Sequence, residues 1–293
     1  MNSRIVPAYA ALIAIWSTTA LAIKWGVTGL PFSLALLTRF GLAAMLAATL
    51  MLWRNRANGG QWLPLDRDHC RAYVIAGGAL SLSMLCSFWA SQYVASGMVA
   101  VLFGLMPLAT ALFAARWLAS PVNATEWLAI SISLAGLAVI FSQNLGWSRS
   151  GLPSMLALLL AMTLQAGAAV LLKRYAASLS SQAVNAGGLL ICAVLSLLFW
   201  LASSAPLPEQ ASGRALAALV YLASIGSVLA GGLYYWLIGQ CRPISVALIS
   251  LITPATSLWL GHWLNDEVLH AYELWGTALI MLGLVLHVMQ RSR

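Results

Sequence analysis

The sequence predicts an all-α integral membrane protein with ten transmembrane helices, arranged as two inverted repeats of five helices. Composition is the first reason: 61% of the 293 residues are hydrophobic and only 8% are charged, against about 25% charged in a soluble domain. Because so few charges cannot cover a water-facing surface, we expect the lipid bilayer to be the main solvent. The lengths of the apolar runs and a long internal repeat are the other two reasons.

Ten apolar runs are each long enough to cross the hydrocarbon core, which takes about 20 residues. Short connections with glycine and proline separate many of them, and the longest polar stretch, Arg54 to His69, has 16 residues, too few for a soluble domain. The first run is interpreted as a membrane helix rather than a signal peptide, because it shows no clear small-residue cleavage site. The runs cover roughly 7–28, 32–53, 70–93, 96–118, 124–143, 151–173, 183–203, 214–237, 243–264 and 270–289.

One stretch, Trp89 to Leu137, recurs without a gap 147 residues later, from Trp236 to Leu284. A period near half the chain length indicates a duplicated unit. We therefore divide the chain into a first repeat, residues 1–146, and a second repeat, residues 147–293. The most telling matched pairs are Trp89/Trp236, Ala100/Ala247, Pro107/Pro254, Glu126/Glu273 and Gly136/Gly283.

The positions of lysine and arginine predict that both termini are cytoplasmic, since cytoplasmic loops are enriched in these residues. With the N-terminus inside, 11 cations fall at the cytoplasmic ends of the runs and 4 at the outer ends. Five helices are an odd number, so the second repeat enters the membrane from the opposite side. Inverted repeats place a cavity near the midplane that opens to each side in turn. The four outer cations are Lys24, Arg39, Arg149 and Arg214.

Several short motifs carry a resemblance to a known family. They are Ile15-Trp16-Ser17-Thr18 followed by Lys24, Thr38-Arg39-Phe40, the Ala-x6-Pro pairs Ala100/Pro107 and Ala247/Pro254, Asp266-Glu267, and Trp275-Gly276. In this order and spacing they resemble the drug/metabolite transporter (DMT) superfamily, in particular its EamA branch. The resemblance spans the whole chain. It implies a multi-pass transporter of the bacterial inner (plasma) membrane, usually an exporter, for a small metabolite that is amino-acid-like or otherwise amphipathic.

One motif departs from the family pattern. The family often has Gly-Glu after the fourth helix as well as after the ninth, and Ala119-Ser120 stands at the first of these positions here. A role for the acidic turn therefore carries over to Glu267 alone.

An arginine inside an apolar run predicts a binding site. Arg39 stands about eight residues into the second run, roughly 12 Å along a helix. A charge at that depth costs about 2.5–3.5 kcal/mol and normally faces a partner or a wet cavity. Lys24 falls in the same outer half of the membrane, and both side chains have the alternative of extending to the lipid headgroups. Glu267 is a possible counter-charge for Arg39.

Aromatic and polar side chains away from the helix ends complete the predicted cavity wall. Trp16 and Gln165 are the clearest, because a polar group at mid-helix needs a partner or water; bridging between helices is the alternative. Pro107 and Pro254 each free a carbonyl one turn earlier, so they are predicted gating points, with a static kink as the alternative. The predicted substrate-binding residues are Trp16, Ser17, Lys24, Arg39, Trp89, Tyr93, Gln165 and Tyr235.

Two further features are interpreted as structural. Ala223, Ser227 and Gly231 form a small-residue stripe that is typical of close helix packing. Glu126 begins the fifth helix three residues after Asn123, an arrangement that favours capping of the helix.

Three classes of function remain open: a secondary transporter or facilitator, an intramembrane enzyme, and a channel-like pore. The sequence has no P-loop for nucleotide-driven pumping, no metal-ligand spacing, and no acid/base cluster within a run, so we expect no enzyme and no cofactor. All seven acids fall in loops or terminal turns, which favours a facilitator or exchanger driven by the cargo's own gradient. The expected partners are a small-molecule substrate and the lipid bilayer, not nucleic acid, with the chain a monomer or weak homodimer.

A reporter protein fused after Arg293 is expected to report the cytoplasm, because of the cation bias between the two sides. The measurement compares reporters that are active only in the cytoplasm with reporters that are active only outside it. A periplasmic signal would overturn both the orientation and the inverted repeat.

Overall fold

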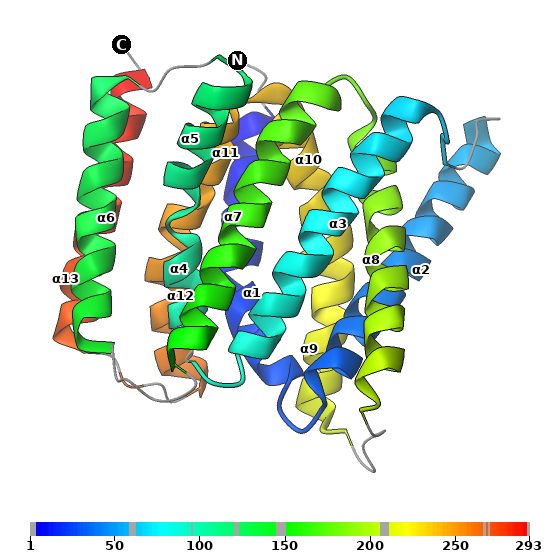
Figure 1. Ribbon diagram of the computed structural model, residues 1–293, viewed down its shortest axis with the longest axis horizontal. Helices are drawn as coiled ribbons and strands as arrows, with labels where there is room; N and C mark the ends of the chain where they lie inside the picture. The colour runs from blue at the N-terminus through cyan, green and yellow to red at the C-terminus, as the bar shows by residue number, and fades with distance from the viewer. Residues whose placement is uncertain are drawn as a thin grey trace.

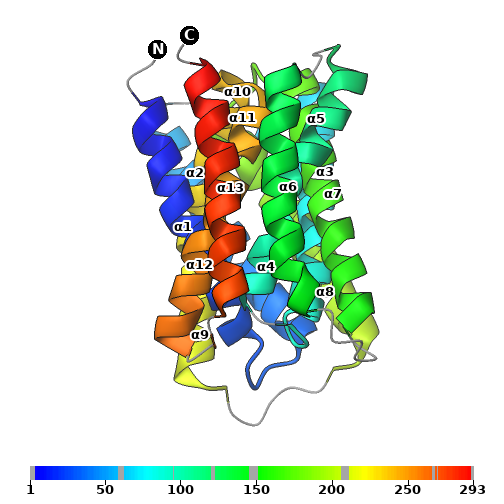
Figure 2. The ribbon, with the colours of Figure 1, turned by 90° about the vertical axis from the view of Figure 1, so that its left-hand side faces the viewer.

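The structure, a computed structural model, describes residues 4–58, 63–94, 96–119, 123–144, 151–205, 211–265, 268 and 270–291. Within these residues every regular element is a helix, and the helices stand side by side in one bundle (Figures 1 and 2). The bounds are α1 Ile5–Gly26, α2 Phe32–Asn58, α3 Arg67–Ala90, α4 Ser96–Phe103, α5 Met106–Trp117, α6 Ala124–Asn144, α7 Gly151–Tyr175, α8 Ser181–Ser203, α9 Gly213–Ala223, the π-helix η1 Ser224–Leu229, α10 Ala230–Gln240, α11 Pro243–Ala247, α12 Ile249–Asn265 and α13 Ala271–Arg291.

Each of the ten predicted apolar runs is helical, and three of them are divided. The fourth run forms α4 and α5, the eighth forms α9, η1 and α10, and the ninth forms α11 and α12. Within the described residues, eight of the runs are long and apolar enough to cross a membrane. The other two runs form α6 and α13, and both include residues whose side chains the structure does not describe. The helix α2 is longer than predicted, because it continues to Asn58 in the polar stretch after the second run.

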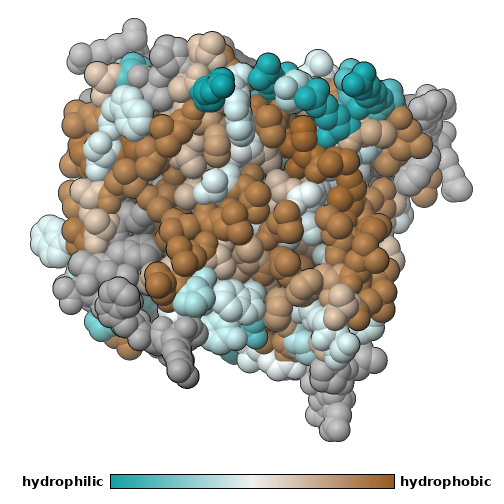
Figure 3. Space-filling view, viewed as in Figure 1, coloured by the Kyte–Doolittle hydropathy of each residue, from teal (hydrophilic) through white to brown (hydrophobic). Residues whose placement is uncertain are grey.

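Both ends of the described chain lie on one face of the bundle, called here the terminal face (Figure 1). The helix α1 runs from this terminal face to the opposite face, and α7 runs the other way (Figures 1 and 2). Hydrophilic side chains gather along the terminal face, above a broad apolar surface (Figure 3). Eight described cations stand in or beside helix ends at the terminal face: Arg4, Arg54, Arg67, Arg71, Arg116, Lys173, Arg174 and Arg242.

The helices α6 and α13 pack together along one edge of the bundle (Figures 1 and 2). Glycines allow the close approach: a Cβ on Gly136 would overlap the carbonyl oxygen of Gly276, and a Cβ on Gly283 would overlap that of Ala129. The two contacts are equivalent at the offset of 147, since 136 + 147 is 283 and 129 + 147 is 276.

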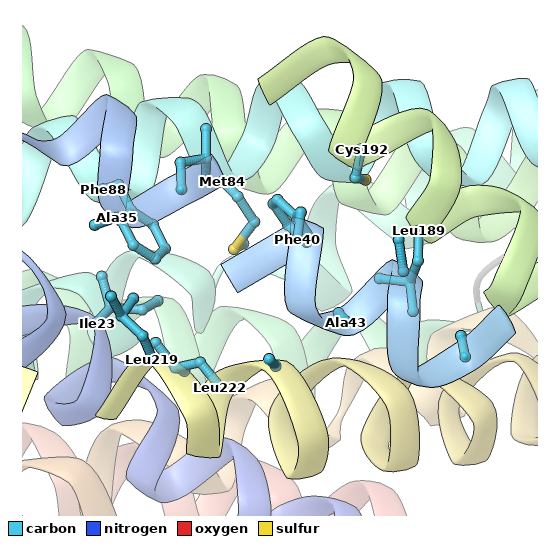
Figure 4. Close-up of a cluster of buried hydrophobic side chains, with 14 of the residues drawn as sticks. Ile23, Ala35, Phe40, Ala43, Met84, Phe88, Leu189, Cys192, Leu219 and Leu222 are labelled. Carbon is cyan, nitrogen blue, oxygen red and sulfur yellow. The ribbon is translucent and has the colours of Figure 1, made fainter. Parts of the chain in front are cut away.

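The largest buried cluster joins α1, α2, α3, α8 and α9 (Figure 4). Phe40 and Phe88 are completely buried in it, with Leu219 and Leu222 on the neighbouring α9. Lipid tails are as apolar as leucine, so burial from water does not drive such helices together; close van der Waals packing does.

The two predicted gating prolines lie in the same part of the bundle. Gly104 and Leu105 separate α4 from α5, and Pro107 follows in the first turn of α5, where its missing N–H costs no helical hydrogen bond. Pro254 stands inside α12. An ideal Cβ on Gly104 would lie 3.4 Å from Cγ of Pro254, so the break in one helix packs against the proline of the other. Their role in gating stays a prediction.

The connection after α5 contains a strained residue. Ala119 has φ of 48°, in the left-handed region where an L side chain costs about 1–2 kcal/mol and glycine costs little. The family that the sequence resembles often has glycine at this position.

The substitution Ala119→Gly is expected to stabilise the protein by up to about 1 kcal/mol, since relief of the strain outweighs the added freedom of the unfolded chain. The measurement is thermal unfolding of the purified protein. Ala115→Gly, at an exposed helical position in α5, is the matched control and should destabilise by about 1 kcal/mol. Equal destabilisation by both changes would contradict the assignment of strain to Ala119.

Candidate functional site

A cavity of about 150 Å³ lies inside the bundle and is lined by residues from α1, α2, α3, α4, α5, α7, α8, η1, α10 and α12. A cavity of this volume accepts a molecule of about the size of benzene. The polar and aromatic side chains in its wall are Trp16, Thr19, Arg39, Ser87, Gln165, Asn185, Ser227, Tyr234, Tyr235, Ser250 and Thr253.

Arg39 brings a positive charge into this wall. Its side chain is 3% exposed. Its Nε donates to the hydroxyl of Ser227 at 3.1 Å, and its Nη1 lies 3.5 Å from the sulfur of Met84. The guanidinium carbon stands 5.2 Å from the ring centre of Phe40 and 5.7 Å from that of Phe88, in the range of cation–π attraction. Among the described residues, no carboxylate lies within ion-pair distance of Arg39.

The π-helix η1 forms the part of the wall that Arg39 contacts. A π-helix adds one residue to a helical turn and is common at functional sites. The amide of Asn185 donates to the carbonyl oxygens of Ser227 at 3.3 Å and of Val228 at 2.9 Å. Asn185 and Arg39 therefore hold η1 from two other helices, α8 and α2.

The serine and threonine hydroxyl groups of the wall have their hydrogens committed to the backbone. The Oγ atoms of Ser87, Ser227 and Ser250 donate to carbonyl oxygens three to five residues earlier in the chain, at 2.9, 2.8 and 2.6 Å. Those of Thr19 and Thr253 donate to carbonyl oxygens at 2.8 and 3.2 Å. A hydroxyl that donates to the backbone still has lone pairs, so these groups offer acceptors to whatever occupies the cavity.

Three aromatic rings stand together in the wall. The ring centres of Trp16 and Tyr234 are 5.3 Å apart, and those of Tyr234 and Tyr235 are 5.4 Å apart. Tyr234 is 7% exposed, and its hydroxyl has no hydrogen-bond partner among the described residues. The cluster offers an apolar aromatic surface to the cavity.

Four of the predicted substrate-binding residues line the cavity: Trp16, Arg39, Gln165 and Tyr235. Of these, Gln165 has an amide with no hydrogen-bond partner in the described part of the chain. These four predicted residues come from α1, α2, α7 and α10 and meet at one cavity.

The other four predicted binding residues lie elsewhere, and two of them hold helices together. Ser17 accepts a hydrogen bond from Thr256 at 2.5 Å, and its carbonyl accepts one from Ser257 at 2.9 Å, so it joins α1 to α12. The Nζ of Lys24 donates to the carbonyl oxygens of Ser91 and Val94 at 2.8 and 3.0 Å, just after the end of α3. A cation there is stabilised by unpaired carbonyls at the helix end.

Trp89 and Tyr93 form a ring pair at the end of α3, with centres 5.3 Å apart, and Tyr93 is 51% exposed. Neither lines the cavity. Glu267, the possible counter-charge of Arg39, lies outside the described residues.

Sequence reasoning missed several polar residues of the wall, above all Asn185 and Ser227. Asn185 was detectable as an amide within an apolar run. Ser227 was assigned to a packing stripe with Ala223 and Gly231, and the structure shows that Ser227 and Gly231 also line the cavity. No sequence signal for the π-helix was available.

Glu126 forms the predicted cap and a contact that was not predicted. Its backbone N–H donates to Oδ1 of Asn123 at 2.8 Å, and its Oε2 accepts from the N–H of Asn123 at 3.1 Å, which confirms the cap. Its Oε1 also pairs with Arg242 at 3.2 Å. Because Arg242 immediately precedes α11, this ion pair joins the two halves of the chain near the terminal face.

Comparison with known proteins finds a matching family model, similar transporters and a solved structure of the same fold. The model of the EamA-like transporter family matches the chain twice, over residues 5–142 and 152–289. The uncharacterized inner membrane transporter YedA of Escherichia coli (strain K12) is 28% identical over 290 residues, covering 97% of this chain and 91% of that protein. An uncharacterized transporter of Archaeoglobus fulgidus is 26% identical over 281 residues, covering 91% of each. A solved structure described only as the crystal structure of a protein has the same fold, with a TM-score of 0.75 at 20% identity over 99% of this chain and 98% of that one.

The substitution Gly231→Ala is expected to destabilise the protein by about 1–3 kcal/mol, because the new Cβ would overlap the side-chain oxygen of Asn185 and displace it from η1. Gly232→Ala is the matched control: nothing lies within 4 Å of its Cβ position, and a helical Gly→Ala change there should stabilise by about 0.5–1 kcal/mol. Thermal unfolding of the two variants measures the difference. Similar stability of both would show that Asn185 is free to move without cost.

Proposed function

Because the chain belongs to the EamA-like transporter family, we propose that it is a secondary transporter that moves a small amphipathic metabolite through the central cavity by alternating access. The resemblance seen in the sequence is confirmed by the family match over both halves of the chain. The protein is a multi-pass membrane protein with the role of a transporter and not of an enzyme. What we propose is the class of cargo, its export from the cell and the alternating-access mechanism.

The cavity at the meeting point of the helix interruptions is the observation that carries the mechanism. Phe103 and Met106 flank the break between α4 and α5, Gly226 and Ser227 belong to η1, and Ser250 follows the break before α12, and all of them line the cavity. Discontinuous helices at a central cavity are the usual form of substrate sites in secondary transporters. An interrupted helix bends at less cost than a continuous one, which suits alternating access.

An inverted repeat of residues 1–146 and 147–293 is supported by equivalent contacts in the two halves. Lys24, at the end of α1, donates to carbonyls just after α3 at the opposite face. Lys173, at the end of α7, donates to the carbonyl of Gly239 near the end of α10 at 2.8 Å, at the terminal face. The glycine contacts between α6 and α13 form a second equivalent set.

Both termini in the cytoplasm, export across the inner membrane, and a monomer or weak homodimer complete the proposal. The cation bias toward the terminal face supports the orientation. A channel-like pore is the less favoured alternative, because a ring of charge or a carbonyl filter would be expected, and one guanidinium is the charged group of the described wall.

The substitutions Trp16→Ala and Gln165→Ala are each expected to lower transport severalfold or more while leaving the yield of folded protein close to wild type, because both side chains line the cavity. The measurement is flux of a metabolite panel into proteoliposomes, under a fixed substrate gradient and clamped voltage. Flux should not require an imposed pH gradient if the cargo gradient alone drives it.

Tyr93→Ala is the control, since Tyr93 is aromatic and half exposed outside the cavity. Wild-type flux in both cavity variants would place the site elsewhere. Uphill accumulation that requires a pH gradient and is lost in Glu267→Gln would overturn the facilitator mechanism.

A further inference from the structure

We propose, on the basis of the transporter function above, that the cavity binds a small organic monoanion whose acid group pairs with Arg39 and whose apolar body packs on Trp16, Tyr234 and Tyr235. The first support is charge. The described wall of the cavity holds one guanidinium and no carboxylate, and a buried cation normally requires a counter-charge. A cargo that supplies one negative charge neutralises the site.

The hydrogen-bond capacity of Arg39 supports an acid group as the ligand. A guanidinium has five N–H donors in a planar fork that matches a carboxylate or related oxyanion. Protein contacts account for Nε, through Ser227, and for one side of Nη1, through the weak acceptor Met84. Phe40, Phe88 and Met84, which are labelled in the apolar cluster of Figure 4, contact the cation. Water competes weakly with a bound anion in such surroundings.

The remaining wall indicates the rest of the cargo. The amide of Gln165 has no partner among the described residues and provides further donors and acceptors. The ring cluster provides an apolar aromatic surface, and the volume of about 150 Å³ suits a body of about the size of benzene. Because the described wall has no carboxylate, an ammonium group on the cargo has no counter-ion among the described residues.

A series of ligands with one benzyl body and different charges tests the proposal without any substitution. Phenylacetate is the monoanion, phenylacetamide the neutral analogue, phenylglycine the zwitterion and benzylamine the cation. Binding to the purified wild-type protein is measured by thermal shift, since a ligand stabilises the state it binds, and by quenching of tryptophan fluorescence. Phenylacetate is expected to bind at least tenfold more tightly than phenylacetamide, with benzylamine weakest.

Arg39→Gln should remove the tenfold preference for phenylacetate over phenylacetamide, and Arg39→Lys should retain a preference for the anion with weaker binding. Arg214→Gln is the matched control, because Arg214 lies at the start of α9 on the opposite face, is exposed, and does not line the cavity. It should keep the wild-type preference.

Equal binding of phenylacetate and phenylacetamide, tighter binding of phenylglycine, or no binding of phenylacetate would each overturn the anion site. Flux is measured separately with phenylmethanesulfonate, which stays charged and does not cross the bilayer unaided. Preferential binding of phenylacetate without any flux of the sulfonate would support the anion site and contradict the transporter mechanism. Flux of benzylamine together with no binding of the anions would support transport and overturn the anion site.

Discussion

The hydrocarbon solvent imposes the constraint on which the rest of this structure depends: a backbone polar group inside the membrane must find its partner within the protein. Continuous helices satisfy it along most of the bundle. The three interruptions, at Gly104–Leu105, at η1 and at Leu248, leave carbonyls to be satisfied in other ways. Asn185 serves two of them at η1. Residues beside or within all three interruptions line the cavity, which brings polar groups together in its wall.

The same constraint explains why serine and threonine are frequent in the cavity wall. Their hydroxyl hydrogens return to carbonyls three or four residues earlier in the chain, which lets a polar side chain stand inside the membrane without a partner from a distant part of the sequence. The guanidinium of Arg39 makes no such hydrogen bond to a nearby carbonyl of its own helix. It depends on Ser227, on a thioether and on two aromatic rings, all from the surrounding packing.

The helices were predictable because apolar length is a property of the chain itself. The ends and breaks of helices were less so: α2 continues to Asn58 because a helix need not stop where the apolar run stops. Within the site, Trp16, Arg39, Gln165 and Tyr235 were predicted from depth and chemistry. The positions of Ser17 and Lys24 depend on which neighbouring helix faces each side chain, and this is set by the tertiary packing.

The pair α6 and α13 stands apart from this arrangement. Its glycine contacts hold it together at one edge of the bundle, and no residue of either helix appears in the described wall of the cavity. The described wall of the cavity is therefore built by eight of the ten helical runs. Divergence among related chains can accordingly proceed at two rates: changes in α6 and α13 would adjust the fit to a membrane or neighbour, while changes in the other eight would alter which compound is carried.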